Sequence, residues 1–230
     1  MKTYKLHLIR HGLTKGNLEG RYIGSTDLPL CTEGKTQLEN LKDSFSYPEV
    51  TTCFTSPLLR ARESAQILFP DASIYELDDL RELSFGEFEG KTVNELMTHP
   101  AYARWIDKND DFIPEGCENG SVFAARTRAV ILQMFEFMMK SNIPEAACVT
   151  HGGVIMSMLS QRALPERPAN LWACDPGCGY TVISSTSLLM RDGFVEAVAI
   201  TPEGYVGEEP PADYAILEDD ATEETPVSDS

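Results

Sequence analysis

Short apolar runs of strand length alternate along this chain with longer amphipathic segments of helix length, and this alternation restricts the possible folds most strongly. The runs expected to form strands are residues 5–9, 51–55 and 146–150, and the segments expected to form helices are residues 57–69, 121–140 and 153–164. Strands that alternate with helices are typical of an α/β domain. We therefore predict three layers, with a largely parallel central sheet flanked by helices.

The C-terminal part of this domain predicts a different pairing. Residues 180–185 and 195–200 are two further apolar runs, and the turn residues at 191–193 between them indicate a hairpin. In the long helix, the apolar spacing predicts one buried stripe formed by Val122, Ala125, Ala129, Leu132, Phe135 and Phe137. The methionines at 134, 138, 139, 156 and 158 are expected to fill the core.

Acidic charge is concentrated at the C-terminal end. The 230 residues carry a net charge of -17, and ten acidic residues but no Lys or Arg lie from Glu203 onward. We expect one domain over residues 1–202 and a flexible acidic tail over residues 203–230. An acidic chain does not offer the basic face that nucleic acid or an anionic membrane requires, so neither is expected as a partner.

The cysteines and the hydropathy pattern indicate a cytoplasmic protein. Six cysteines occur without a CxxC pair, so free thiols in a reducing compartment are expected. No run of about 18 uncharged apolar residues occurs, which predicts that no segment spans a membrane. Residues 1–10 also lack the basic head and apolar stretch of a signal peptide.

Polar residues follow the three predicted parallel strands at the points where the strands end. Arg10-His11-Gly12 follows the first strand, residues 56–61 with Arg60 follow the second, and His151-Gly152-Gly153 follows the third. The carboxyl ends of parallel strands meet at one edge of a sheet. Arg10 and Arg60, expected at adjacent strand ends, have the planar guanidinium groups that bind phosphate. The sequence therefore predicts an anion site.

His11 is the candidate nucleophile of this site. Neighbouring positive charge disfavours protonation of an imidazole, so the arginines are expected to keep His11 neutral, with a lone pair available for attack on phosphorus. Gly12 would let a backbone carbonyl approach and hold the second ring nitrogen. His151 would then donate to the phosphoryl oxygens.

Glu82 is the candidate for proton transfer to the leaving oxygen and, later, from the attacking water. Partial burial beside Leu83 or Phe85 would raise its pKa toward the working pH. Glu87 and Glu89 are close neighbours, so this local argument by itself does not separate the three carboxylates.

Four motifs occur together in the chain. Residues 8–14 followed by Asn17 resemble an RHGxTxxN signature, residues 56–61 an SPLxRA helix start, residues 82–90 a segment with a general acid, and residues 150–152 a motif with a second catalytic histidine. On these motifs, and in this order, the chain resembles the histidine phosphatase superfamily, the phosphoglycerate mutase-like group.

The resemblance implies a phosphoglycerate mutase-like fold and a role for each matching residue. It implies that a phosphate is surrounded by Arg10, His11, Arg60 and His151, that His11 is phosphorylated, and that Glu82 is both acid and base. It also implies substrate contacts from Asn17, Ile23, Gly24 and Gly152. Neither a metal ion nor an organic cofactor is implied.

The residues after Glu82 favour the phosphatase branch. The mutases of the family carry His-Tyr-Gly at this place, whereas this chain has Ser84-Phe85-Gly86, which resembles the branch that includes the α-ribazole phosphatase-like members. We expect a phosphoric monoester hydrolase of the histidine acid phosphatase type that acts on a small phosphorylated metabolite, as a monomer or a homodimer. A mutase, a metal-dependent hydrolase and a catalytically silent binding protein are the alternatives, and the cation of Arg10 beside His11 disfavours a metal ligand there.

Residues 92–118 are expected to form a lid over the site. Tyr102, Trp105 and Phe112 in this lid could contact the substrate or belong to a core, and the sequence leaves both alternatives open. The Gly-Glu-Ser motif that family members often carry before the long helix is altered in residues 114–121, so a substrate contact from that loop is not predicted.

Overall fold

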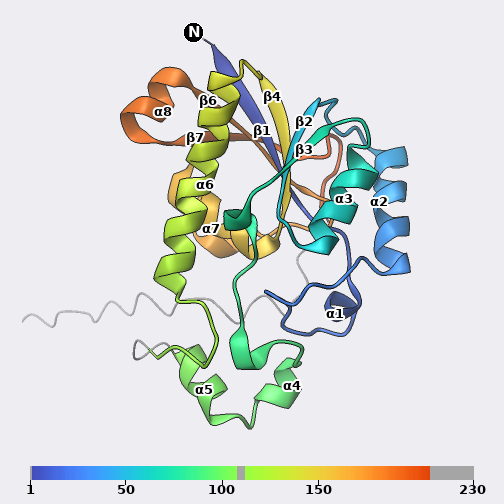
Figure 1. Ribbon diagram of the computed structural model, residues 1–230, viewed down its shortest axis with the longest axis vertical. Helices are drawn as coiled ribbons and strands as arrows, with labels where there is room; N and C mark the ends of the chain where they lie inside the picture. The colour runs from blue at the N-terminus through green and yellow to red at the C-terminus, as the bar shows by residue number, and fades with distance from the viewer. Residues whose placement is uncertain (1, 108–111, 208–230) are drawn as a thin grey trace, which may run out of the picture.

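A seven-stranded mixed sheet forms the centre of the computed structural model, which describes residues 2–107 and 112–207 (Figure 1). The strand order is β3-β2-β4-β1-β6-β7-β5. The pairs β1/β4, β2/β4, β2/β3 and β5/β7 are parallel, and β1/β6 and β6/β7 are antiparallel. The bounds are β1 Thr3–Arg10, β2 Thr52–Thr55, β3 Ser73–Glu76, β4 Glu145–Thr150, β5 Ala163–Leu164, β6 Gly179–Ser185 and β7 Val195–Thr201.

Helices cover both faces of this sheet, so the predicted three layers are confirmed (Figure 1). The helices are α1 Lys15–Leu18, α2 Thr32–Ser44, α3 Leu59–Leu68, α4 Val93–Leu96, α5 Pro100–Asp107, α6 Gly120–Lys140, α7 Gly152–Arg162 and α8 Thr186–Asp192. Leu6 and Leu8 of β1 pack in one buried cluster with α6 and α7, whereas Ile9 packs in a second cluster with α2 and α3. This division follows from the alternation of side chains along a strand.

The C-terminal pairing is confirmed, but its connection is not a tight turn. β6 and β7 pair antiparallel, as the hairpin prediction requires. Helix α8 occupies the connection and is capped at its C-terminus by Gly193, whose φ of 67° lies in the left-handed region that glycine adopts without strain. The sequence pattern also did not predict α2 or the exposed edge strand β3, because neither has a continuous apolar face.

The predicted stripe of the long helix is wrong except at Phe135. Val122 is 55% exposed and Ala125 and Ala129 are also exposed, while Leu132 and Phe137 are partly buried. The buried residues of α6 are Phe123, Thr127, Val130, Ile131, Met134, Phe135 and Met138. The helix therefore turns its Phe-Val-Met face toward the sheet, because large side chains gain more from burial than alanines. The methionine prediction is confirmed, with 134, 138 and 158 fully buried and 139 and 156 packed against the same core.

Helices α4 and α5 lie beyond the carboxyl ends of the parallel strands (Figure 1). They surround a small cluster in which Phe88, Leu96 and Tyr102 are buried and Trp105 is partly buried. Tyr102 is 4% exposed, so of the two alternatives for this residue the structure selects the core. Within the described ranges, no helix is both long and apolar enough to cross a membrane. The predicted tail falls outside these ranges from residue 208 onward.

The corrected face of α6 can be tested by two truncations. Met134→Ala should lower the free energy of unfolding by about 2–5 kcal/mol, since it removes a fully buried side chain from a packed core. Val122→Ala should change it by less than about 0.5 kcal/mol, because that side chain faces solvent. Urea unfolding followed by circular dichroism measures both. Equal losses for the two variants would contradict the burial pattern.

Candidate active site

Three strand ends bring the predicted site residues together, but not in the predicted order. β4 lies between β1 and β2, so Arg10 and Arg60 do not come from adjacent strand ends. His151, which follows β4, lies between them instead. The rings of His11 and His151 have their centroids 5.0 Å apart. The site is therefore a row of residues in which a histidine follows each of two neighbouring strands.

His11 is held in one tautomer by its own neighbour. Its Nδ1 donates to the carbonyl oxygen of Gly12 at 2.7 Å, so the Nε2 lone pair is free to accept. Arg60 Nε donates to that Nε2 at 3.2 Å. The expected neutral ring has a different main cause from the one that the sequence suggested. Burial, at 5% exposure, lowers the pKa of His11 most, and the positive charges of Arg60 and Arg10 lower it further.

Arg60 is a fully buried cation whose three nitrogens all donate. Nη1 donates to the carbonyl oxygen of Thr26 at 2.8 Å, and Nη2 donates to that of Gly24 at 2.7 Å. Its Nε is shared between His11 and Nδ1 of His151, the latter at 3.3 Å. These bonds fix the guanidinium plane beside both imidazoles.

His151 is also buried and neutral. Its Nε2 donates to the hydroxyl oxygen of Ser56 at 2.8 Å, while Nδ1 accepts from Arg60. Burial lowers the pKa of His151 well below its ordinary value, and His11 and Arg60 add to this effect. The sequence analysis did not identify Ser56 as a partner, although it is the first residue of the second strand-end motif.

Arg10 contributes a buried donor that could bind an anion. Its Nη1 donates to the carbonyl oxygen of Cys174 at 2.8 Å, but its Nε is buried without a hydrogen-bond partner among the described residues. Gly152, the first residue of α7, lies beside it, since a Cβ at Gly152 would be 3.5 Å from this Nε. A guanidinium next to the N-terminus of an 11-residue helix is a favourable place for a phosphate.

Glu82 reaches the same site from the loop before η2, the short 3-10 helix Gly86–Phe88. Its Oε1 accepts from the N–H of Leu83 and its Oε2 from the N–H of Gly153, both at 2.9 Å. Burial raises the pKa of Glu82 above its ordinary value, although the two amide bonds and the charges of Arg60 and Arg10 act in the opposite direction. A carboxyl group with a raised pKa can donate a proton near neutral pH.

Of the four residues predicted to contact substrate, two border the site and two contact the local structure around it. Asn17 completes the capping box of α1, whose N-cap is Thr14, because its Oδ1 accepts from the backbone N–H and the hydroxyl of Thr14. Ile23 packs against Gly16, where a Cβ would come within 2.4 Å of it. Gly24 supplies the carbonyl that binds Arg60, and Gly152 begins α7. In these contacts Asn17 and Ile23 support the local structure, while Gly24 and Gly152 border the site.

Glu89 is a residue whose importance the sequence analysis missed. Its carboxylate accepts from the backbone N–H groups of Gly24, Ser25 and Thr26, and from the Thr26 hydroxyl at 2.6 Å. It also accepts from the N–H of Phe85 at 3.0 Å. Glu89 therefore holds the loop whose carbonyls bind Arg60. Its seven-residue distance from Glu82 gives no indication of these contacts, because the loop lies more than 60 positions away in sequence.

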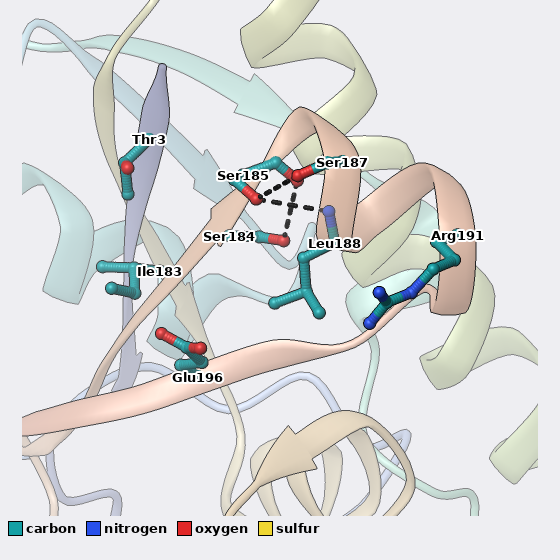
Figure 2. Close-up of a pocket in the computed structure, with 8 residues that line it drawn as sticks. All are labelled: Thr3, Ile183, Ser184, Ser185, Ser187, Leu188, Arg191 and Glu196. Atoms are coloured by element: carbon teal, nitrogen blue, oxygen red, sulfur yellow. Dashed lines mark hydrogen bonds between the residues drawn. The ribbon is translucent and has the colours of Figure 1, made fainter. Parts of the chain in front are cut away.

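A separate hollow of about 370 Å³ lies at the opposite end of β1, near Thr3 (Figure 2). Ser184, Ser185 and Arg191 line part of it, and the Ser185 hydroxyl accepts from the N–H of Leu188 at the start of α8. None of the strand-end residues described above lines this hollow. In the part of the chain that the structure describes, no group of three or more His, Cys, Asp or Glu is placed to hold a metal ion.

Comparisons with known proteins identify the family of this chain. Residues 6–193 match the sequence model of the histidine phosphatase superfamily (branch 1). The adenosylcobalamin/alpha-ribazole phosphatase of Escherichia coli K12 is 30% identical over 180 residues, which are 76% of this chain and 87% of that protein. The sedoheptulose 1,7-bisphosphatase of Saccharomyces cerevisiae is 34% identical over 130 residues, 49% of this chain and 48% of that protein.

Solved structures share the fold. The alpha-ribazole phosphatase from Shigella flexneri aligns with a TM-score of 0.70 at 24% identity, over 90% of this chain and 100% of that chain. A phosphoglycerate mutase from Thermus thermophilus aligns with a TM-score of 0.58 at 32% identity, over 85% of this chain and 97% of that chain. The predicted phosphoglycerate mutase-like fold is thereby confirmed.

The role of Glu89 in holding the 24–26 loop can be tested by pH-dependent stability. Burial raises the pKa of Glu89, but its several hydrogen bonds together outweigh burial and hold the folded-state pKa below the ordinary 4.5. The stabilising effect of this carboxylate is therefore complete above the ordinary pKa and disappears as the pH falls through the lowered value. Glu89→Gln turns an amide donor toward backbone N–H groups and should cost about 1–3 kcal/mol at neutral pH.

Urea unfolding at about pH 7 and about pH 3.5 measures the difference in free energy of unfolding between the wild type and Glu89→Gln. This difference should be smaller at the lower pH. Glu39→Gln, an exposed position on α2, is the control and should change little at either pH. A difference that is the same at both pH values would contradict the proposed contacts.

Proposed function

Because the chain belongs to the histidine phosphatase superfamily (branch 1), we propose that it is a metal-independent phosphomonoesterase that forms a phosphohistidine on His11. The observation that carries the proposal is the state of His11, which is buried and neutral, with Nδ1 bound to Gly12 and Nε2 turned toward Arg60. An imidazole in this state has its nucleophilic lone pair on the nitrogen that faces the cations.

In the first step, the lone pair of His11 Nε2 attacks phosphorus and the bond between phosphorus and the ester oxygen breaks. The carboxyl proton of Glu82 goes to the departing oxygen, so an alcohol leaves and Glu82 becomes a carboxylate. Arg10 and Arg60 donate to the phosphoryl oxygens and balance their negative charge. His151 can donate to them from Nδ1 in its other tautomer, in which Nε2 accepts from the Ser56 hydroxyl. The Nε–H that Arg60 gives to Nε2 becomes available to a phosphoryl oxygen once that lone pair is bonded to phosphorus.

In the second step, the Glu82 carboxylate takes a proton from a water molecule, whose oxygen attacks the phosphohistidine. The bond between phosphorus and Nε2 breaks, phosphate leaves, and His11 is neutral again. Glu82 has regained its proton, so both residues return to their starting states. One carboxyl group can serve as acid and then as base because the two steps use opposite protonation states.

The names of the relatives support phosphoester hydrolysis, and a small phosphorylated metabolite is our proposed substrate class. The E. coli relative is an adenosylcobalamin/alpha-ribazole phosphatase and the yeast relative is a sedoheptulose 1,7-bisphosphatase. We further propose that residues 92–118 act as a lid on the 1–202 domain. Supporting this role, Glu87 and Glu115 join the lid to the segment after Glu82, with the Glu87 N–H donating to the Glu115 carbonyl at 2.9 Å.

Mutase-type phosphoryl transfer is the second candidate, because the Thermus thermophilus protein at 32% identity is a phosphoglycerate mutase. Ser84-Phe85-Gly86 after Glu82 favours hydrolysis, since it replaces the His-Tyr-Gly of the mutases. Exchange of phosphate between phosphoglycerates, dependent on a bisphosphorylated primer, would identify a mutase. Release of inorganic phosphate without such exchange would identify the hydrolase.

Removal of the nucleophile should abolish turnover. We expect His11→Ala to lower kcat/KM for phenyl phosphate at least about 1,000-fold, since it removes the lone pair that attacks phosphorus. Labelled substrate should leave an acid-labile, alkali-stable phosphoryl group on the wild-type enzyme and none on the variant. His99→Gln, which changes a histidine in the lid region, should retain both activity and labelling.

Three results would contradict the mechanism. Unchanged turnover in His11→Ala would indicate contaminating activity or a catalytically silent protein. Turnover that persists without any labelled histidine would exclude the covalent intermediate. Loss of activity in EDTA, with recovery on addition of zinc, would exclude the metal-independent reaction.

The pH profile should report the acid. Glu82 must be protonated when the ester bond breaks, so kcat/KM for phenyl phosphate should fall as the pH rises through its raised pKa. Glu82→Gln should have a lower kcat/KM, by about 100-fold or more, and should lack this alkaline limb. Glu87→Gln is the matched control and should keep it. An alkaline limb that persists in Glu82→Gln would assign the proton to another group.

A further inference from the structure

Arg126 of α6 reaches the backbone of the segment that carries Glu82. Its Nη1 donates to the carbonyl oxygens of Asp79 at 2.8 Å and Arg81 at 2.7 Å, and its Nη2 donates to the carbonyl oxygen of Glu82 at 3.2 Å. The carbonyl of Leu80 accepts from the hydroxyl of Thr150 at 2.8 Å. All four carbonyls of residues 79–82 are thus bound, three of them by one side chain.

Glu118 fixes the guanidinium that makes these bonds. Its Oε1 accepts from Nε of Arg126 and its Oε2 from Nη2, both at 2.7 Å, in the bidentate geometry that arginine and a carboxylate favour. The ring of Phe123 lies against the guanidinium, with 4.7 Å between the ring centroid and Cζ. The two side chains are 16% and 18% exposed, so water competes weakly for the pair.

The same pair joins the Glu82 segment to the residues that return from the lid. The N–H of Glu118 donates to the carbonyl of Ser84 at 2.9 Å, and the hydroxyl of Ser84 donates to the carbonyl of Gly116 at 3.1 Å. Glu82 is therefore held at both ends. Its main chain is bound to α6 through Arg126, and its carboxylate is bound to α7 through the N–H of Gly153.

We infer that Arg126, oriented by Glu118, is a positioning residue that fixes where the carboxyl group of Glu82 meets the leaving oxygen. This inference rests on the proposed function, in which Glu82 is the acid. Without the guanidinium, three backbone carbonyls lose their donor, and the segment is free to shift relative to α7. A displacement of about 1 Å in a reacting group costs about 100-fold in rate. Residues 114–121, where the Gly-Glu-Ser motif is altered, thus contribute to the site indirectly, because Glu118 in this segment binds Arg126.

Leaving-group dependence separates this role from a general loss of structure. Departure of phenolate from phenyl phosphate needs a proton, whereas departure of dinitrophenolate from 2,4-dinitrophenyl phosphate does not. We expect Arg126→Met to lower kcat/KM about 100-fold for the first substrate and by less than about 5-fold for the second. Glu82→Gln should show the same contrast. The double variant should lose little beyond Glu82→Gln alone, because both changes remove the same step.

Matched variants control for charge and for folding. Arg128→Met removes a cation from the exposed side of the same helix and should leave both substrates unaffected. Arg126→Lys keeps the charge but lacks the planar donor set, so it should not restore the rate with phenyl phosphate. Competitive inhibition by inorganic phosphate should be unchanged in Arg126→Met, which shows that the phosphate pocket is intact.

The outcomes distinguish the positioning role of Arg126 from the acid role of Glu82. Equal losses of Arg126→Met with both substrates, or full rescue by Arg126→Lys, would overturn the positioning role while leaving Glu82 as the acid. Absence of leaving-group dependence in Glu82→Gln would overturn the acid assignment and the positioning role together. His11→Ala tests the phosphohistidine independently of both.

Discussion

The buried guanidinium of Arg60 is the constraint on which the rest of the site depends. A cation at 1% exposure must replace its lost hydration with hydrogen bonds, and it does so with the carbonyls of Gly24 and Thr26 and with the nitrogens of His11 and His151. The loop that supplies the carbonyls is in turn held by the carboxylate of Glu89. The hydrogen bonds that stabilise the buried guanidinium therefore also orient it toward both imidazoles.

Burial sets the protonation states in this site, and charge reinforces them for the histidines. Desolvation lowers the pKa of His11 and His151 and raises that of Glu82, so all three groups are driven toward their neutral forms. A neutral imidazole can attack and a neutral carboxyl can donate. Desolvation therefore supplies both a nucleophile that needs no general base to deprotonate it and the acid that the proposed reaction needs.

Two positions near the site, 24 and 153, require glycine because other atoms lie too close to the backbone for a side chain to fit. A Cβ at Gly24 would lie 1.8 Å from the carbonyl oxygen of Leu83, and a Cβ at Gly153 would lie 2.4 Å from Oε1 of Glu82. The first contact brings the Arg60-binding loop against the segment after Glu82, and the second lets an N–H of α7 reach the carboxylate. The loop that binds the cation and the helix that binds the carboxylate can each approach the Glu82 segment only where no side chain intervenes.

The sequence by itself determined the α/β class and the three parallel strands, and its motifs predicted a site formed by His11, Arg10, Arg60, Glu82 and His151, because strand ends and local motifs are short-range patterns. Tertiary structure decided that β4 lies between β1 and β2, which face of α6 is buried, and that Glu89, Ser56 and Arg126 hold the site residues in place. These features depend on contacts between residues far apart in the chain, such as Arg126 and Glu82. The spacing of residues within one segment does not predict which distant carbonyl or amide a side chain will bind. These hydrogen-bond partners are fixed only when the layers pack.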